Sequence, residues 1–120
     1  MKSMCSAQVR NIGGTAVIAL SGDVDGTAAE TLTGAYTEAV GAAGTATIVL
    51  DFAAVDYINS TGIALIVSVL ARARAERRKV VASGLSPHYR EVFDITRLSD
   101  FIELFPDLED AVSQLTGPAA

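Results

Sequence analysis

The sequence lacks the features that mark secreted proteins and membrane proteins. Its one cysteine, Cys5, cannot form a disulfide within the chain, so nothing indicates an oxidising compartment. The N-terminal segment MKSMCSAQVRNIGG has no apolar run of the kind found in signal peptides. The longest apolar run, residues 63–71, is far shorter than the roughly 20 residues that cross a bilayer. We therefore expect a soluble, cytoplasmic protein that does not enter a membrane.

The sequence also lacks motifs that bind nucleotides, motifs that bind zinc and the nucleophile motif of serine hydrolases. The chain has no P-loop and no G-x-G-x-x-G, and its one histidine, His88, has no cysteine or histidine cluster around it. Asp23 and Asp25 could bind a metal, but two closely spaced carboxylates are a weak signal, and solvated turn residues are the alternative. A hydrolase that uses Ser60 and His88 would need a G-x-S-x-G elbow, which is absent. We expect no enzymatic activity and no cofactor.

What the sequence does contain is the composition of one globular domain. Half of its 120 residues are apolar and 19% are charged, which is enough to bury a core without disulfides. The net charge of −5 argues against a nucleic-acid surface, which needs clustered cations. We expect a single domain over residues 1–120 that binds no nucleic acid.

Strand and helix patterns alternate after a leading hairpin. Short β-branched or alternating segments predict strands at residues 8–12, 16–20, 47–50, 80–82 and 101–104. Apolar residues at helical spacing predict helices over residues 27–40 and 61–77, from Pro87 with Ser86 as its cap, and after Pro106. Such alternation predicts parallel crossovers and an α/β fold, in which functional residues gather at the carboxyl ends of the strands.

Two polar turns, residues 21–25 and 57–62, are expected at that edge of the sheet. Asn59 and Ser60 both suit a helix N-cap, because a short side-chain oxygen can accept from the free amides of the first turn. Ser60 is therefore either a simple cap or a phosphoacceptor. The second interpretation rests on the partial positive charge of a helix N-terminus, which favours a phosphate of about −1.5 to −2 charge.

The helix predicted after Ser60 is apolar on nearly all sides. Four residues form the stripe that we expect to face the sheet: Ile63, Ile66, Val67 and Leu70. Leu65 and Val69 are left over, so either neighbouring helices cover them or they form an exposed apolar strip that binds a partner. The basic run at residues 72–79 is interpreted as a solvated helix end, with an acidic partner as the alternative.

Four segments, in order, resemble the STAS family, named for sulfate transporters and anti-sigma factor antagonists. Residues 20–25, LSGDVD, resemble its L-x-G-E-L-D turn, and residues 29–32 stand where the family has its first helix. Residues 48–70 resemble its buried strand, its D-S-[ST]-G switch and its second helix, and residues 93–98, FDITRL, resemble its F-D-I-T-G-L motif. The resemblance implies a mixed β-sheet of four or five strands with about four helices packed mainly on one face.

The resemblance further implies an anti-sigma factor antagonist that works by partner switching. In that scheme the unphosphorylated antagonist binds an anti-sigma factor that is also a serine kinase, and the sigma factor is freed. The kinase then phosphorylates the switch serine, docking is lost, and a PP2C-type phosphatase restores it. The family's phosphorylated serine falls on Ser60, with Thr61 as a secondary hydroxyl and with Asn59 and Gly62 shaping the turn.

Five residues are predicted to form the docking surface: Asp23, Asp25, Ile63, Leu65 and Val69. The chain departs from the family pattern at Asn59, where the switch motif has Asp, and at Arg97, where F-D-I-T-G-L has Gly. Loss of that carboxylate reduces repulsion toward a phosphate but changes what a kinase would recognise. The alternative function is a non-switching STAS scaffold or ligand-binding module. A transporter-linked domain is not expected, because no transmembrane segment precedes this one.

Overall fold

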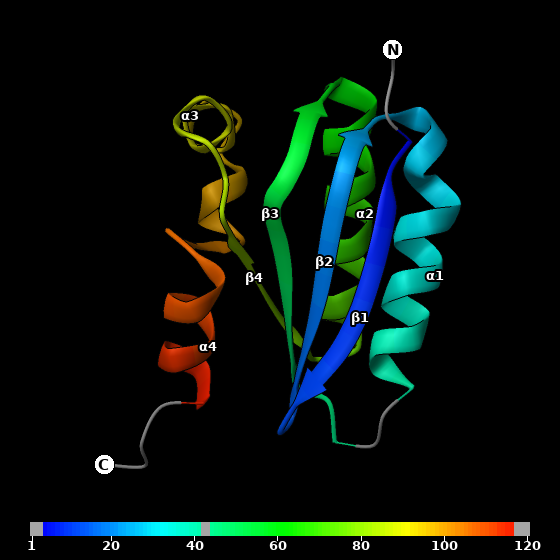
Figure 1. Ribbon diagram of the computed structural model, residues 1–120, viewed down its shortest axis with the longest axis vertical. Helices are drawn as coiled ribbons and strands as arrows, with labels where there is room; N and C mark the ends of the chain where they lie inside the picture. Colours follow the sequence, from blue (N-terminus) through cyan, green and yellow to red (C-terminus); the bar gives the residue numbers. More distant parts are fainter. Residues whose placement is uncertain (1–3, 42–43, 117–120) are drawn as a thin grey trace.

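The fold is a five-stranded mixed sheet with helices on both faces (Figure 1). The computed structural model describes residues 4–41 and 44–116. The strands are β1 (Ser6–Ile12), β2 (Thr15–Val24), β3 (Thr47–Ile58), β4 (Lys79–Ser83) and β5 (Glu103–Phe105). The helices are α1 (Ala29–Val40), α2 (Ser60–Ala75), α3 (Pro87–Ile95) and α4 (Leu108–Thr116), with short 3₁₀ turns η1 (Gly26–Ala28) and η2 (Leu98–Asp100).

The strands lie in the sheet in the order of the sequence. β1 pairs antiparallel with β2 as a hairpin, and β2, β3, β4 and β5 pair parallel. Each parallel pair is joined by a helical crossover, as parallel neighbours require. The predicted α/β class with a mixed sheet is confirmed.

Two hydrophobic clusters hold the layers together, one on each face of the sheet. Because successive side chains of a strand point to opposite faces, Ile48 and Leu50 of β3 join the larger cluster and Val49 joins the smaller. α1, α2 and α3 all contribute to the larger cluster, whose buried residues include Tyr36, Ile66 and Phe93. Among the described helices, α4 covers the other face, with Ala111 buried against the strands. The helices thus pack mainly on one face, as predicted.

β2 and β3 extend further than the sequence pattern predicted. Residues 21–24 continue β2, and residues 51–58 continue β3, so the predicted turns begin later than expected. The cause is pairing between these two strands, which continues to Val24 opposite Ile58 through two register shifts. Backbone hydrogen bonds there override the low strand preference of Gly and Asp. The last strand also differs: it is Glu103–Phe105 rather than 101–104, because Phe101 is the C-cap of η2 and a turn separates η2 from the strand.

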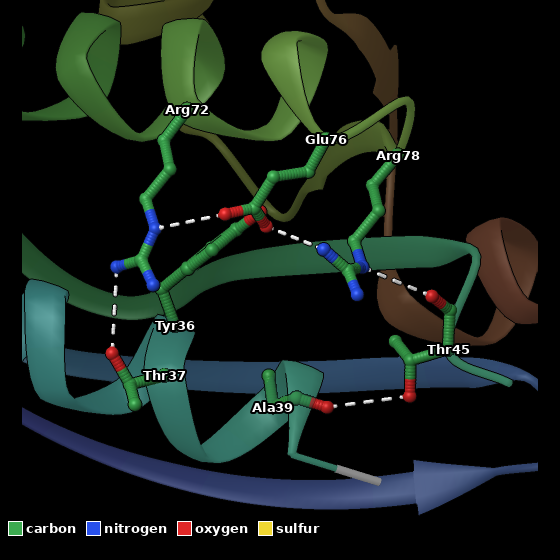
Figure 2. A network of polar contacts seen from close by, with 7 residues as sticks. All are labelled: Tyr36, Thr37, Ala39, Thr45, Arg72, Glu76 and Arg78. Atoms are coloured by element: carbon green, nitrogen blue, oxygen red, sulfur yellow. Dashed lines mark hydrogen bonds and ion pairs between the residues drawn. The ribbon is translucent and has the colours of Figure 1, made fainter. Parts of the chain in front are cut away.

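A polar network fixes the C-terminal end of α2 against α1 (Figure 2). The Tyr36 hydroxyl donates to Glu76 Oε1 at 2.7 Å, and the Arg72 guanidinium lies 4.4 Å from the centre of the Tyr36 ring. Arg78 binds Glu76 and also donates to the Thr45 carbonyl at 3.1 Å. Burial raises the pKa of the Tyr36 hydroxyl, whereas the hydrogen bond from Tyr36 lowers the pKa of Glu76. α2 is therefore anchored at the end opposite to Ser60.

Candidate functional site

The carboxyl ends of β2 and β3 meet where α2 begins, at the upper end of the molecule in Figure 1. Val24 and Ile58 form the last parallel pair. The backbone N–H of Asn59 then donates to the Val24 carbonyl at 3.2 Å. The two segments singled out in the sequence therefore lie side by side at one edge of the sheet, as predicted.

Asn59, and not Ser60, caps α2. Its backbone is extended, and its side-chain oxygen accepts from the Gly62 N–H at 2.8 Å, which satisfies one of the free amides of the first turn. Ser60 is the first helical residue and is exposed, so the interpretation of Ser60 as the cap is wrong. Among residues 4–41 and 44–116, none hydrogen-bonds to the Ser60 hydroxyl. That hydroxyl is presented to solvent beside the helix N-terminus.

Gly62 brings the start of α2 into direct contact with β2. A Cβ at this position would lie 2.0 Å from the Val24 carbonyl oxygen, a separation that real Cβ atoms do not show. Thr61 is exposed, and its methyl carbon lies 3.3 Å from where a Cβ of Gly26 would be. Thr61 therefore packs beside η1, and Ser60 and Thr61 are both exposed hydroxyl-bearing residues at the start of the helix.

The two aspartates of this edge have different environments. Asp25 is only 3% exposed, and its carboxylate accepts from the backbone N–H of Thr27 at 2.9 Å and from the Thr27 hydroxyl at 2.5 Å. It caps η1, so its predicted place on the docking surface is wrong. Burial raises the pKa of the Cys5 thiol, and the Asp25 carboxylate raises it further. Asp23 is half-buried opposite Tyr57 of β3 and stays a candidate.

The apolar faces of α2 are rotated from the predicted arrangement. Val69 is 7% exposed and belongs to the larger cluster, and half-buried Leu65 packs against the same cluster. α1 lies against α2 on this side, so the interpretation that neighbouring helices cover Leu65 and Val69 is confirmed. The alternative, an exposed apolar strip that places both residues on the docking surface, is wrong. Val67, expected to face the sheet, is instead 45% exposed. Ile63 is half-buried one turn after Ser60 and keeps its predicted place near the switch turn.

Tyr89 of α3 is a supporting residue that the sequence did not reveal. Its hydroxyl accepts from the Ile58 N–H at 2.9 Å, which fixes the last residue of β3 just before Asn59. One signal in the sequence points to this contact. The Ser86 cap places Tyr89 in the first turn of a helix, and helical side chains point back toward the helix N-terminus, so the Tyr89 hydroxyl extends beyond the start of α3. The exposed ring of Tyr57 lies next to this contact along β3.

Within the described parts of the chain, no three His, Cys, Asp or Glu side chains stand close enough to hold a metal ion. None of the helices described is long and apolar enough to cross a membrane. The site therefore consists of an exposed serine at a capped helix start, which follows the end of the strand pair that carries Asp23 and Tyr57.

Comparison with known proteins assigns this architecture to a family. Residues 6–111 match the STAS domain family. BtrV of Bordetella bronchiseptica, named as an anti-sigma factor antagonist, is 39% identical over 59 residues, which is 49% of this chain and 48% of BtrV. This chain thus spans about half the length of that relative.

Solved structures share the fold at low sequence identity. A crystal structure of an anti-sigma factor antagonist from Mycobacterium paratuberculosis has a TM-score of 0.79 at 23% identity and covers 94% of this chain and 95% of its own. Phosphorylated SpoIIAA of Bacillus has a TM-score of 0.70 at 22% identity and covers 92% of this chain and 99% of its own. With most of its length matched by the family's sequence pattern, the protein belongs to the STAS domain family.

Proposed function

We propose that this protein is an anti-sigma factor antagonist in a bacterial partner-switching system, and that phosphorylation of Ser60 switches it. The observation that carries the proposal is the exposed Ser60 hydroxyl at a helix start whose cap is supplied by Asn59. Because Ser60 has no capping role, a kinase can modify it without breaking the cap. BtrV and the M. paratuberculosis structure carry the same functional name, which supports the class of partner.

Electrostatics at the start of α2 suit a phosphoserine. The first amides of the helix point toward the Ser60 end and carry a partial positive charge, which stabilises an anion there. Asn59 is uncharged, so it does not repel a phosphate as the aspartate of the family motif would. The structure of SpoIIAA in a phosphorylated form provides a precedent for modification on this fold. We expect phosphorylated Ser60 to be tolerated by the folded domain.

The docking surface that we propose is defined by Asp23, Tyr57, Ser60, Thr61 and Ile63, and we call it the switch surface. Tyr57 is 48% exposed and supplies an aromatic group of the kind that dominates protein interfaces. A phosphate of about −1.5 to −2 charge in such an interface is costly to desolvate. Phosphorylation therefore releases the partner by making the interface unfavourable, without any change of fold.

The partner implied by the family is an anti-sigma factor with serine kinase activity. That partner binds the ATP whose phosphate is transferred to Ser60, and a PP2C-type phosphatase removes the phosphate and restores docking. In this scheme the chain acts in the cytoplasm as a single non-enzymatic domain, and it affects transcription by releasing a sigma factor. The alternative is a constitutive STAS scaffold, which Asn59 favours because it replaces the acidic residue next to the switch serine.

Intact-mass spectrometry tests the proposal directly. The protein is incubated with ATP and candidate anti-sigma kinases from its own organism, alongside the variants Ser60→Ala and Thr61→Ala. The switch is supported if the wild-type protein and Thr61→Ala each gain one phosphate and Ser60→Ala gains none. Tight binding of a candidate without phosphate transfer supports the scaffold, and recovery of transfer in Asn59→Asp would then identify the residue responsible.

A further inference from the structure

A groove of about 950 Å³ lies along the C-terminal half of α2, across from the segment that joins α3 to β5. Its apolar lining includes Val67 and Leu70 on one side and Leu98 and Phe101 on the other. Val67 is 45% exposed and Phe101 is 65% exposed, so two large apolar side chains face solvent within one groove. A surface of this kind indicates a binding site for apolar groups.

The groove is basic, although the protein is acidic. It is lined by five of the nine basic residues of the chain and by two of its fourteen acidic residues. The basic residues are Arg74, Arg77, Arg78, Lys79 and Arg97, and the acidic ones are Asp100 and Glu103. Positive charge is thus concentrated around one apolar surface, while the chain as a whole carries a net charge of −5. Such a distribution attracts an acidic ligand and orients it.

Two of these arginines are not neutralised within the domain. Lys79 pairs with Glu103 at 3.4 Å, Arg97 pairs with Asp100 at 2.9 Å, and Arg78 pairs with Glu76. Arg74 and Arg77 are exposed, and neither pairs with an acidic group in the described part of the chain. They are available to carboxylates of a partner, which arginine binds in bidentate geometry.

Backbone conformation adds an independent observation. Among the described residues, two that are not glycine have a positive φ: Arg77 at 59° and Arg97 at 65°. This left-handed region favours glycine, particularly just after a helix such as α2. Both positions are nevertheless occupied by arginines, and both arginines line the groove. Glycine would suit the backbone better at both positions, so the backbone conformation does not account for the two arginine side chains.

We propose that this groove binds an acidic polypeptide segment with apolar side chains, such as an acidic amphipathic helix of a partner protein. Arg74 and Arg77 would bind its carboxylates, and Val67 and Phe101 would contact its apolar residues. A concave surface suits a polypeptide rather than a flat lipid surface.

The groove is separate from the switch surface. Arg74 lies fourteen residues along α2 from Ser60, which corresponds to about 20 Å of helix. The proposal therefore goes beyond the Ser60 switch: a second segment can bind whether or not Ser60 is phosphorylated. A partner with two such segments, or two different partners, could then occupy the protein together.

Titration of the ¹⁵N-labelled protein with a synthetic amphipathic peptide of glutamate and leucine tests the proposal. We expect amide shifts confined to residues 67–80 and 96–103. The variant Arg74→Glu/Arg77→Glu should weaken binding at least about tenfold, whereas Arg10→Glu/Arg90→Glu, an equal charge change at exposed positions outside the groove, should leave it unchanged. Ser60→Glu should also leave it unchanged, which separates this result from that of the switch.

Several outcomes would overturn the proposal. These are shifts outside the groove, equal binding of a lysine–leucine peptide, or groove shifts produced by anionic vesicles or an RNA oligonucleotide but not by the acidic peptide. If Arg74→Glu/Arg77→Glu does not fold, Arg74→Gln/Arg77→Gln and Phe101→Ala replace it. Unchanged peptide affinity in both of these variants would equally rule the groove out.

Discussion

Substitution of Gly62 by alanine should destabilise the protein, although alanine is normally the better helix former. The new Cβ would lie 2.0 Å from the Val24 carbonyl oxygen and 3.1 Å from a side-chain carbon of Val24, whereas ordinary contact begins at 3.4 Å. Both the oxygen and the glycine belong to backbone that the β2–β3 pairing and the Asn59 cap hold in place. The start of α2 must therefore move away from β2 by about 1 Å.

The magnitude follows from what that movement breaks. Overpacking of this kind costs about 1–3 kcal/mol, and loss of the hydrogen bond from Asn59 N–H to Val24 costs about 1 kcal/mol more. Alanine regains about 0.5–1 kcal/mol of helix propensity relative to glycine. The net expectation is a loss of about 1–3.5 kcal/mol in the free energy of unfolding.

Gly34 provides a matched control within the same chain. It lies in the middle of α1, is exposed, and has no atom within 4 Å of an added Cβ. Gly34→Ala should therefore stabilise the protein by about 0.5–1 kcal/mol. Urea unfolding of both variants measures the difference. Equal changes of the same sign in the two variants would show that contact with Val24 does not constrain the start of α2.

Other predictions concern the polar contacts. Asn59→Ala should cost about 1 kcal/mol in urea unfolding, while Asn59→Asp should retain the cap; equal losses in both would contradict the capping role. Tyr89→Phe should cost about 1–2 kcal/mol and speed hydrogen exchange of the Ile58 amide, and an unchanged exchange rate would rule out that bond. The hydrogen bond from Tyr36 lowers the pKa of Glu76 from its ordinary value. The stabilisation that this bond provides is therefore present above the ordinary pKa of a glutamate and is lost as pH falls through the lowered pKa. The difference in urea midpoint between wild type and Glu76→Gln should shrink on acidification, and a constant difference would contradict this.

Local signals in the sequence predicted much of the fold correctly. Ser86 before Pro87 is a cap followed by a residue that suits the first helical turn, and α3 begins there with the Ser86 oxygen accepting from Tyr89. The β-branched apolar run at residues 47–50, bounded by Gly44 and Asp51, predicted a fully buried strand, and residues 48–50 are buried within β3. In both cases the information lies within a few consecutive residues, which is why it could be read without the fold.

The errors concern features that depend on distant residues. α2 is apolar on most sides, so its periodicity did not determine which face meets the sheet, and the position of α1 decided that Val69 is covered. The extension of β3 past residue 50 depends on pairing with β2. The sequence could not show whether Asn59 or Ser60 caps α2, because that depends on which residue begins the helix. The partner of Ile58, the Tyr89 hydroxyl, is 31 residues away in the chain.

The order of the strands also bears on how the chain folds. Because each strand after β1 pairs with the one before it in the sequence, its partner strand has already been synthesised when it emerges from the ribosome. Each parallel pairing closes a loop over one crossover only, which keeps the entropy of closure low for a sheet that is mostly parallel. The hairpin of β1 and β2 offers the first template, and β5 is the last strand added. Synthesis from the N-terminus therefore builds the sheet outward from one edge, with no strand inserted between two others.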